Sequence, residues 1–330
     1  MPRTLTALGE NFPLATPFRI SRGVKTAADV VTVTIAEGDR IGRGECVPYP
    51  RYGESVDGSI AEIEAVRDAV EQGASRRDLL NLLPAGAARN AVDCALWDLE
   101  LKLAGSNVAT ALGLKKPLRP IATAMTVGLD TPDAMGLAAA ALADVPLIKV
   151  KVDRTDPAAQ LRAVRAAAPS PRMIVDPNES WTMAEVSDLQ GLMQQLRIDL
   201  LEQPLPAHED GDLNGFASAI LIAADESIHV AADLDSLPDG YGVVNIKLDK
   251  AGGLTAALDL AQAARARGLG VMTGCMICSS LSIAPAWAIA ADSAFVDLDG
   301  PLWLSADRDG GVTGDRGLLL PPQPGFWGGL

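Results

Sequence analysis

Basic side chains and long apolar runs are scarce in this sequence of 330 residues. Its 28 Lys and Arg residues are outnumbered by 42 Asp and Glu residues, and the net charge of −14 repels nucleic-acid phosphates and anionic lipids. No apolar run approaches the roughly 18 residues that a membrane-spanning helix needs. We therefore expect no nucleic-acid partner and no membrane partner, but a small-molecule substrate.

Signal-like segments, cysteine and histidine are also scarce. The first residues contain no apolar stretch typical of a secretory signal, so we expect a cytoplasmic protein. The four cysteines are too few for a disulfide scaffold. Cys275 and Cys278 form a C-x-x-C pair, but no second pair stands at metal-ligand spacing, and the only histidines are His208 and His229. A packing role is therefore favoured over a zinc or redox role.

The pattern of predicted secondary structure changes near residue 118. Residues 1–118 mix extended stretches at 5–20 and 30–46 with helical patterns at 55–72 and 87–103, which predicts an α+β unit. A break with lysines and prolines follows at 113–120.

Eight short apolar runs then alternate with alanine-rich helical stretches, which predicts parallel strands joined by helices and favours a closed (β/α) barrel. An open doubly wound sheet is the alternative. Against it, no G-x-G-x-x-G follows a strand, and Walker A and G-x-S-x-G motifs are absent. The eight runs are 121–129, 147–152, 173–176, 200–203, 220–225, 243–248, 270–276 and 294–299.

Carboxylates stand at the ends of three consecutive predicted strands, where barrel enzymes carry their reactive groups. Asp176, Glu202 and Asp225 would converge there and repel one another unless a cation lay between them. Ligation by oxygen alone suits Mg²⁺, with Mn²⁺ as the alternative. Each carboxylate taken singly could cap a following helix, but three in register favour a metal site.

Lysines follow the second and sixth predicted strands. Strand alternation puts Lys149 and Lys151 on one face, and repulsion between them favours loss of a proton from one of the two. On the sixth strand we expect Lys247 to point into the barrel mouth, with Asp249 on the same face and Lys250 on the other, unless the loop has already begun there.

The second and sixth strands of an eight-stranded barrel face each other across its axis. A substrate carboxylate bound at the metal would therefore present its α-carbon between Lys151 and Lys247. One lysine can remove the α-proton, and the conjugate acid opposite can return a proton to the other face. The predicted reaction is a 1,1-proton transfer, with the metal stabilising the charge of the ene-diolate.

These residues resemble those of the enolase superfamily. The Lys149-Val-Lys151 motif and residues 245–253 resemble its muconate-lactonising subgroup, and the two histidines argue against the subgroup typified by mandelate racemase. The whole chain is similar to the L-Ala-D/L-Glu dipeptide epimerases, through segments 44–55, 83–90, 201–207, 274–279 and 297–301.

The resemblance implies an α/β fold: a modified TIM barrel, (β/α)₇β, at 119–304 under an α+β N-terminal capping domain at 1–118, to which residues 305–330 return. It implies an isomerase that epimerises L-Ala-D/L-Glu dipeptides with one Mg²⁺ per subunit, in murein peptide recycling, and it is compatible with an oligomer. Lys151 and Lys247 are the implied catalytic pair. Lys149 is expected to tune Lys151 and to contact the bound carboxylate.

The resemblance also implies a substrate-binding set. Asp297 and Asp299 are expected to bind the α-ammonium group, although two acids could also cap the turn before Gly300. Cys278 stands where several relatives in the wider subgroup carry glutamate. The remaining expected substrate-binding residues are Thr126 and three candidate cations for the Glu side chain, among which the sequence does not choose: Arg22, Lys25 and Arg51.

Three alternatives remain. A lyase of the same subgroup, either a cycloisomerase or an o-succinylbenzoate synthase-like dehydratase, would use the same barrel and lysines. Its substrates carry no α-ammonium group, so unpaired acids at Asp297 and Asp299 argue against it. An epimerase of other dipeptides is the second alternative. The third, a binding protein without turnover, would be expected to lack a lysine or a carboxylate, and none is missing.

Overall fold

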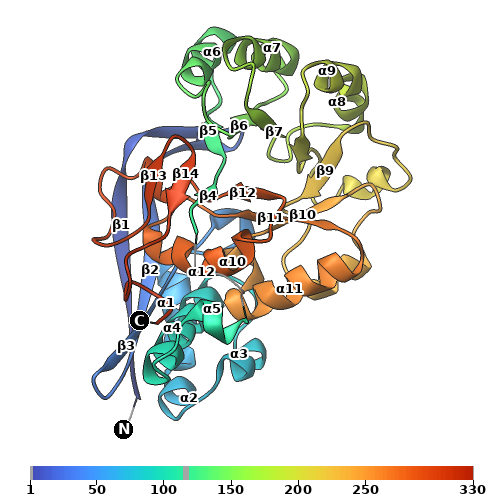
Figure 1. Ribbon diagram of the computed structural model, residues 1–330. Coiled ribbons are helices and arrows are strands. Elements are labelled where there is room, and N and C mark those ends of the chain that lie inside the picture. Colours follow the sequence, from blue (N-terminus) through green and yellow to red (C-terminus); the bar gives the residue numbers. More distant parts are fainter. Residues whose placement is uncertain (1–2, 114–118, 330) are drawn as a thin grey trace.

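The computed structural model describes residues 3–113 and 119–329. The break between the two predicted units, at 113–120, includes residues 114–118, which lie outside the described residues. The predicted domain boundary at residue 118 lies there too. The chain begins with a three-stranded antiparallel sheet of β1 (Arg3–Ile20), β2 (Gly23–Glu37) and β3 (Arg40–Cys46), drawn in blue in Figure 1. The predicted strand at 30–46 is thus two strands, because Gly38 at φ 64° allows a tight turn between them.

Helices pack against this sheet and complete the cap. The longest, α4, buries nearly all of its residues and approaches β3 very closely. A Cβ atom on Gly42 would lie 2.2 Å from Ala95 O, and one on Gly44 would lie 2.1 Å from Ala91 O, so only glycine fits there. The cap helices are α1 (Val56–Ala65), α2 (Arg67–Glu71), α3 (Arg76–Leu82), α4 (Ala87–Leu103) and α5 (Val108–Ala111).

Eight parallel strands form the second sheet, in chain order, and each overlaps one of the eight predicted runs. Its two edge strands meet where Ala124 N donates to Val296 O at 2.8 Å, which closes the barrel. A small cluster of buried side chains fills the interior of the barrel. It contains Ala124, which directly precedes β5, and one residue from each of the other seven strands, ending with Phe295 on β12. The strands are β5 (Met125–Val127), β6 (Leu147–Lys151), β7 (Arg172–Asp176), β8 (Leu200–Glu202), β9 (Leu221–Ala224), β10 (Val243–Ile246), β11 (Gly270–Gly274) and β12 (Phe295–Asp297).

Only 3₁₀ turns lie between β8 and β9 and between β9 and β10, but the other neighbouring strands are joined by helices, which cover the outside of the barrel (Figure 1). They are α6 (Pro132–Ala140), α7 (Pro157–Ala167), α8 (Met183–Asp188), α9 (Gln190–Gln195), α10 (Leu248–Ala251), α11 (Leu254–Ala266) and α12 (Ser280–Ala290). Short 3₁₀ turns lie at η1 (Pro50–Tyr52), η2 (Asp210–Leu213), η3 (Ala231–Asp235) and η4 (Gly300–Trp303).

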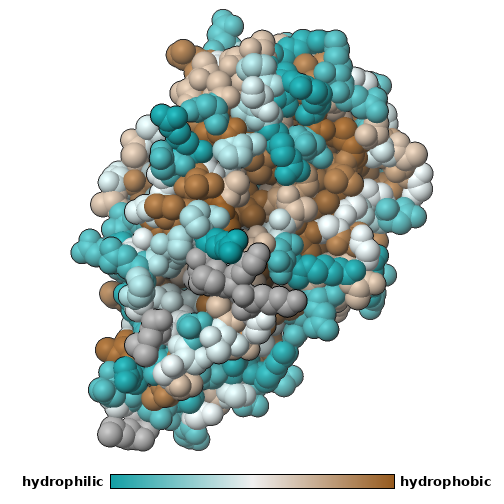
Figure 2. All heavy atoms as spheres, viewed as in Figure 1, coloured by the Kyte–Doolittle hydropathy of each residue, from teal (hydrophilic) through white to brown (hydrophobic). Residues whose placement is uncertain are grey.

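After the barrel, the chain runs back to the cap. Strand β14 (Leu318–Leu320) pairs with β13 (Thr313–Asp315) on one side and with β4 (Ile121–Ala122) on the other. Beyond these strands, Trp327 Nε1 donates to Cys94 O on α4 at 3.2 Å. In Figure 2, hydrophobic atoms gather mainly in the middle of the face shown, with hydrophilic atoms at its top and bottom. Among the described residues, no helix combines the length and apolar character needed to cross a membrane.

Candidate active site

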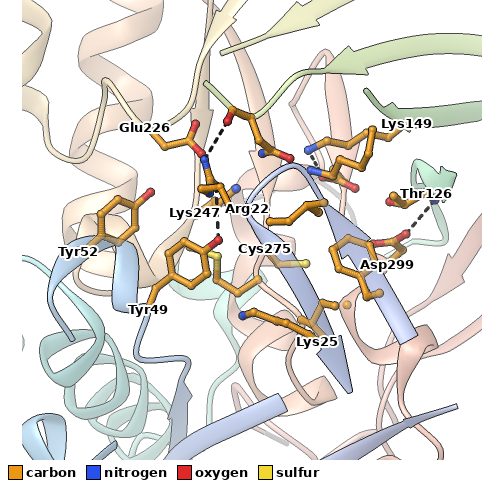
Figure 3. A pocket seen from close by; sticks show the side chains of 18 residues that line it. Arg22, Lys25, Tyr49, Tyr52, Thr126, Lys149, Glu226, Lys247, Cys275 and Asp299 are labelled. Carbon is orange, nitrogen blue, oxygen red and sulfur yellow. Dashed lines mark hydrogen bonds and ion pairs between the residues drawn. The ribbon is translucent and has the colours of Figure 1, made fainter. Parts of the chain in front are cut away.

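A partly open cavity of about 70 Å³ lies between the carboxyl ends of the barrel strands and the cap. Figure 3 shows side chains from both parts of the chain turned toward it. The cap contributes Arg22 from the β1–β2 turn, Lys25 from β2, and Tyr49 and Tyr52 from the segment after β3. The barrel contributes Thr126, Lys149, Lys151, Asn178, Glu226, Lys247, Cys275, Asp297 and Asp299.

The three predicted metal ligands lie on neighbouring strands. Asp176 ends β7, Glu202 ends β8 and Asp225 directly follows β9, and all three are at most 1% exposed. Burial and the negative charges of Asp176 and Asp225 raise the pKa of Glu202 to about 8. Burial would also raise the pKa values of Asp176 and Asp225, but neighbouring lysines outweigh burial and lower them, so only Glu202 of the three is favoured in its neutral form.

Lys149 is the ammonium group nearest the centre of the cluster. Its Nζ lies 2.9 Å from Glu202 Oε1, 2.8 Å from Asp297 Oδ2 and 3.0 Å from Asp176 Oδ2. Burial would lower the pKa of Lys149, but these acids raise it well above its usual value. Acids therefore keep Lys149 in its charged form, in line with the expectation that Lys149 is not the base; the proton loss expected for one lysine of the pair stays a prediction.

The two lysines predicted to act as bases reach the cavity from strands that lie four apart in the sheet. Lys151 Nζ donates to Asp176 Oδ2 at 2.5 Å, and Lys247 Nζ donates to Asp225 Oδ2 at 2.6 Å. Burial would lower the pKa of Lys247, but Asp225 outweighs burial and raises it. Each lysine is thus held by a different carboxylate of the cluster.

The carboxylate cluster fits a divalent cation in its donor chemistry. Its members are buried oxygen donors, and Glu202 Oε2 has no partner in hydrogen-bond geometry, although Lys149 Nζ lies 2.7 Å away. Within residues 3–113 and 119–329, no group of three or more His, Cys, Asp or Glu side chains is already arranged around a metal position. Lysine ammonium groups neutralise the acids instead.

The two acids after the last strand differ in their partners. Asp297 Oδ2 accepts from Lys149, whereas its buried Oδ1 has no hydrogen-bond partner among the described residues. Asp299 Oδ2 accepts from the main-chain N of Thr126 at 3.0 Å and from Trp303 Nε1 at 3.2 Å. Burial and the charge of Asp297 raise the pKa of Asp299 to about 6. Thr126 therefore acts here through its backbone, which orients Asp299.

The three candidate cations of the cap are not equivalent. Arg22 Nη2 lies 2.8 Å from Glu226 Oε1, and its Nη1 lies 3.0 Å from Glu179 Oε2. Arg51 Nη2 lies 2.8 Å from Glu179 Oε1. Lys25 makes no ion pair with a described residue and lies over the Tyr49 ring, 4.7 Å from its centroid. Arg51 is the one candidate that does not line the cavity.

At Lys250 the strand has already ended, which is the alternative that the sequence left open. Helix α10 begins at Leu248, so strand alternation stops at Lys247. Lys250 Nζ therefore turns toward the cluster and donates to Asp225 Oδ1 at 2.6 Å, whereas Asp249 turns to the cap and accepts from Val47 N at 2.9 Å. The spacing of Lys247 and Lys250 by three residues, before two glycines, is the signal of a helical turn that could have shown this.

Two glutamates that bind the cap arginines were not found from the sequence. Glu226 follows Asp225 directly and lines the cavity, and Glu179 follows Asp176 by three residues. Each stood beside a predicted ligand, but the arginines that they bind lie more than 100 residues away in the chain. Such long-range pairs leave no local pattern in one sequence.

Two family models match the two parts of the chain that meet at this site. Residues 3–113 match the mandelate racemase / muconate lactonizing enzyme N-terminal domain, and residues 134–326 match the enolase C-terminal domain-like family. The chain therefore belongs to the enolase superfamily, as its sequence predicted.

Proteins similar to this chain over nearly its whole length include an epimerase and a racemase. The chain is 45% identical to an L-Ala-D/L-Glu epimerase of Escherichia coli (strain K12), over 96% of this chain and 99% of that protein. It is 44% identical to an N-acetyl-D-glutamate racemase of Pseudoalteromonas sp, over 91% of this chain and 95% of that protein. Epimerases and racemases are isomerases, and the predicted enzyme class, an isomerase, is confirmed.

A solved structure agrees with this classification. An enolase family member from Agrobacterium tumefaciens, with homology to dipeptide epimerases, superposes with a TM-score of 0.96 at 49% identity. The match covers 99% of this chain and 100% of that chain, which was solved with bound sodium and L-Ala-L-Glu. The predicted fold, a (β/α)₇β barrel with an α+β cap, is confirmed.

Proposed function

We propose that this enzyme epimerises L-Ala-D/L-Glu dipeptides by 1,1-proton transfer, in the cytoplasm and with Mg²⁺ or Mn²⁺, as a step of murein peptide recycling. The observation that carries the proposal is the position of Lys151 and Lys247, which line one cavity from opposite strands of the barrel. Two bases on opposite sides of one carbon permit removal of a proton from one face and its return to the other.

Asp176, Glu202 and Asp225 are the residues that would hold the metal ion. A divalent cation there would stabilise negative charge on the substrate carboxylate as the α-proton leaves. Lys149 lies beside the same acids and supplies a second positive charge for that carboxylate. Lys151 and Lys247 then hold and move the α-proton.

Asp297 and Asp299 form the proposed pocket for the substrate α-ammonium group. Asp297 Oδ1 is buried and has no partner in the part of the chain that the structure describes, so it can accept a hydrogen bond from an ammonium group without losing an existing one. Asp299 is fixed by the backbone of Thr126 and by Trp303. A lyase substrate without an ammonium group would leave Asp297 Oδ1 unsatisfied, which favours the epimerase over the lyase.

Lys25 is the cation that we assign to the Glu side chain of the substrate. Arg22 and Arg51 are together balanced by two carboxylates, those of Glu179 and Glu226. Lys25 lines the cavity and has no carboxylate partner among the described residues. Burial lowers the pKa of Lys25, and a substrate carboxylate would restore its preference for the charged form.

Proton NMR of L-Ala-L-Glu in D₂O, with purified enzyme and Mg²⁺, tests the proposal. We expect loss of the Glu α-proton signal and appearance of the L-Ala-D-Glu diastereomer. N-acetyl-L-glutamate, which lacks the ammonium group, is the matched substrate control and is expected to exchange much more slowly. Faster exchange of N-acetyl-L-glutamate would replace the dipeptide with an N-acyl amino acid, and no exchange of either, with Mg²⁺ or Mn²⁺, would overturn the proposal.

A further inference from the structure

Two separate segments of the cap converge on one carboxylate of the barrel. Glu179 Oε2 accepts from Arg22 Nη1 at 3.0 Å and from Arg51 Nε at 2.9 Å, and its Oε1 accepts from Arg51 Nη2 at 2.8 Å. Arg22 lies in the turn between β1 and β2, whereas Arg51 lies in η1, which follows β3 in the sequence. The Glu179 side chain is only 8% exposed, so these charged bonds are largely shielded from solvent.

The backbone around Glu179 is held in an uncommon conformation. Asn178 has φ 48° and Glu179 has φ 65°, the left-handed region that a glutamate rarely adopts. Such strain persists where surrounding contacts impose it, and it is common at functional sites. Here the turn places the Glu179 carboxylate between the two parts of the chain: it binds both cap arginines, and its Oε1 also accepts from Ala207 N of the barrel at 3.0 Å.

The same turn also contacts the proposed metal site. Asn178 N donates to Asp176 Oδ1 at 2.8 Å, and Asn178 O accepts from Arg22 Nη1 at 3.1 Å. One short turn thus connects a metal ligand on β7 with a cap segment that covers the cavity.

We propose that Glu179 is a positioning residue that holds the cap closed over the substrate, by binding Arg22 and Arg51 at once. It does not touch the cavity itself and acts through the two arginines. This inference rests on the proposed function for its kinetic consequence, but closure of the cap can be measured without turnover. Loss of closure weakens retention of the dipeptide and leaves the lysines in place, so KM changes more than kcat.

Cys275 provides the measurement of closure. It lines the cavity and is partly exposed, whereas Cys46, Cys94 and Cys278 are at most 1% exposed. Alkylation of native protein by iodoacetamide, followed by peptide mass spectrometry, reports how often the cap opens at Cys275. The three buried cysteines report global unfolding in the same sample.

The test compares Glu179→Gln and Arg51→Met with a matched control. Asp259→Asn breaks another ion pair between cap and barrel, because Arg77 Nη1 on α3 lies 2.5 Å from Asp259 Oδ2 on α11, far from the cavity. We expect Glu179→Gln to raise the alkylation rate of Cys275 about tenfold, and the KM for L-Ala-L-Glu about tenfold, with kcat changed less than about twofold. Asp259→Asn is expected to change none of these.

Each outcome decides one of the two proposals. Unchanged Cys275 alkylation in both Glu179→Gln and Arg51→Met would overturn the closure role of Glu179, whatever the turnover. Faster alkylation in an enzyme that turns over no dipeptide would keep the closure role and overturn the proposed function. In the double variant, alkylation no faster than in Glu179→Gln alone is the expected result, and fully additive effects would show that Arg51 and Glu179 act independently.

Discussion

Lys151 and Lys247 line one cavity from β6 and β10, which lie four strands apart, and each donates to a different carboxylate of the proposed metal site. The pairing holds each ammonium group near the cluster and on its own side of the barrel. Opposed bases of this kind predict that each lysine serves one stereochemical direction.

Removing either lysine is expected to abolish exchange from one epimer only. Lys151→Ala should slow α-proton exchange of one epimer of L-Ala-Glu in D₂O by about 10³-fold, and Lys247→Ala should do the same for the other epimer. NMR of each epimer with each variant measures this. Arg154→Ala, which breaks only a surface pair with Glu185, is the control. Full activity of either lysine variant would exclude the two-base assignment.

Lys25 is expected to select substrates by side-chain charge. Lys25→Met should lower kcat/KM for L-Ala-L-Glu by about 10- to 100-fold, because the substrate carboxylate loses its cation, and should leave L-Ala-L-Leu nearly unchanged. Steady-state assays with both dipeptides measure the ratio. A parallel loss on both substrates would show that Lys25 supports the cavity wall rather than recognising charge.

Asp297 and Asp299 are expected to act on the amino end of the substrate. Asp297→Asn and Asp299→Asn should each raise the KM for L-Ala-L-Glu by at least about tenfold, since each removes a negative charge that pairs with the ammonium group. N-acetyl-L-glutamate lacks that group, so its slow exchange should change far less. Equal effects on both substrates would remove the ammonium-binding role from these acids.

The parts of the site that the sequence could predict are those with a local signature. Asp176 and Glu202 each end an apolar run, and Asp225 follows one, so their convergence follows from the barrel alone. The contact of Lys250 with Asp225 could not be predicted without knowing the exact residue at which β10 ends and α10 begins. The pairs of Glu179 with Arg22 and Arg51 join residues 157 and 128 positions apart, which depend on how the cap sits on the barrel.

Lys250 is expected to contribute to stability more than Lys247 does. Lys250 is 1% exposed, and its Nζ donates to Asp225 Oδ1, to Ile228 O and to Asn245 O. Lys250→Met leaves these acceptors buried without a donor and should lower the free energy of unfolding by about 3–5 kcal/mol. Lys247→Met, which loses one partner, is the matched control and should cost clearly less. Urea unfolding at pH 7 compares the two, and equal losses would contradict the prediction.

Asp93 on α4 is expected to make the enzyme less stable as pH rises. Its Oδ2 accepts from Thr255 N at 2.9 Å, and its Oδ1 has no partner within residues 3–113 and 119–329. Burial raises the pKa of Asp93 from 3.8 to about 6. The folded state therefore binds this proton more tightly than the unfolded state. The stabilisation is fully present below pH 3.8 and is lost as pH rises through 6, for a total of up to about 3 kcal/mol.

Asp93→Asn removes this titration, so its unfolding free energy relative to the wild type should rise between pH 4.5 and 7, by about 2 kcal/mol. Asp78→Asn is the control from another cap helix. Hydrogen bonds from Ser75 lower the pKa of Asp78 below 3.8, so that carboxylate is ionised in both states throughout this range. Its difference from the wild type should therefore stay constant. Urea unfolding at pH 4.5, 5.5 and 7 measures both differences, and a constant difference for Asp93→Asn as well would show that Asp93 ionises in the folded enzyme without the cost of burial.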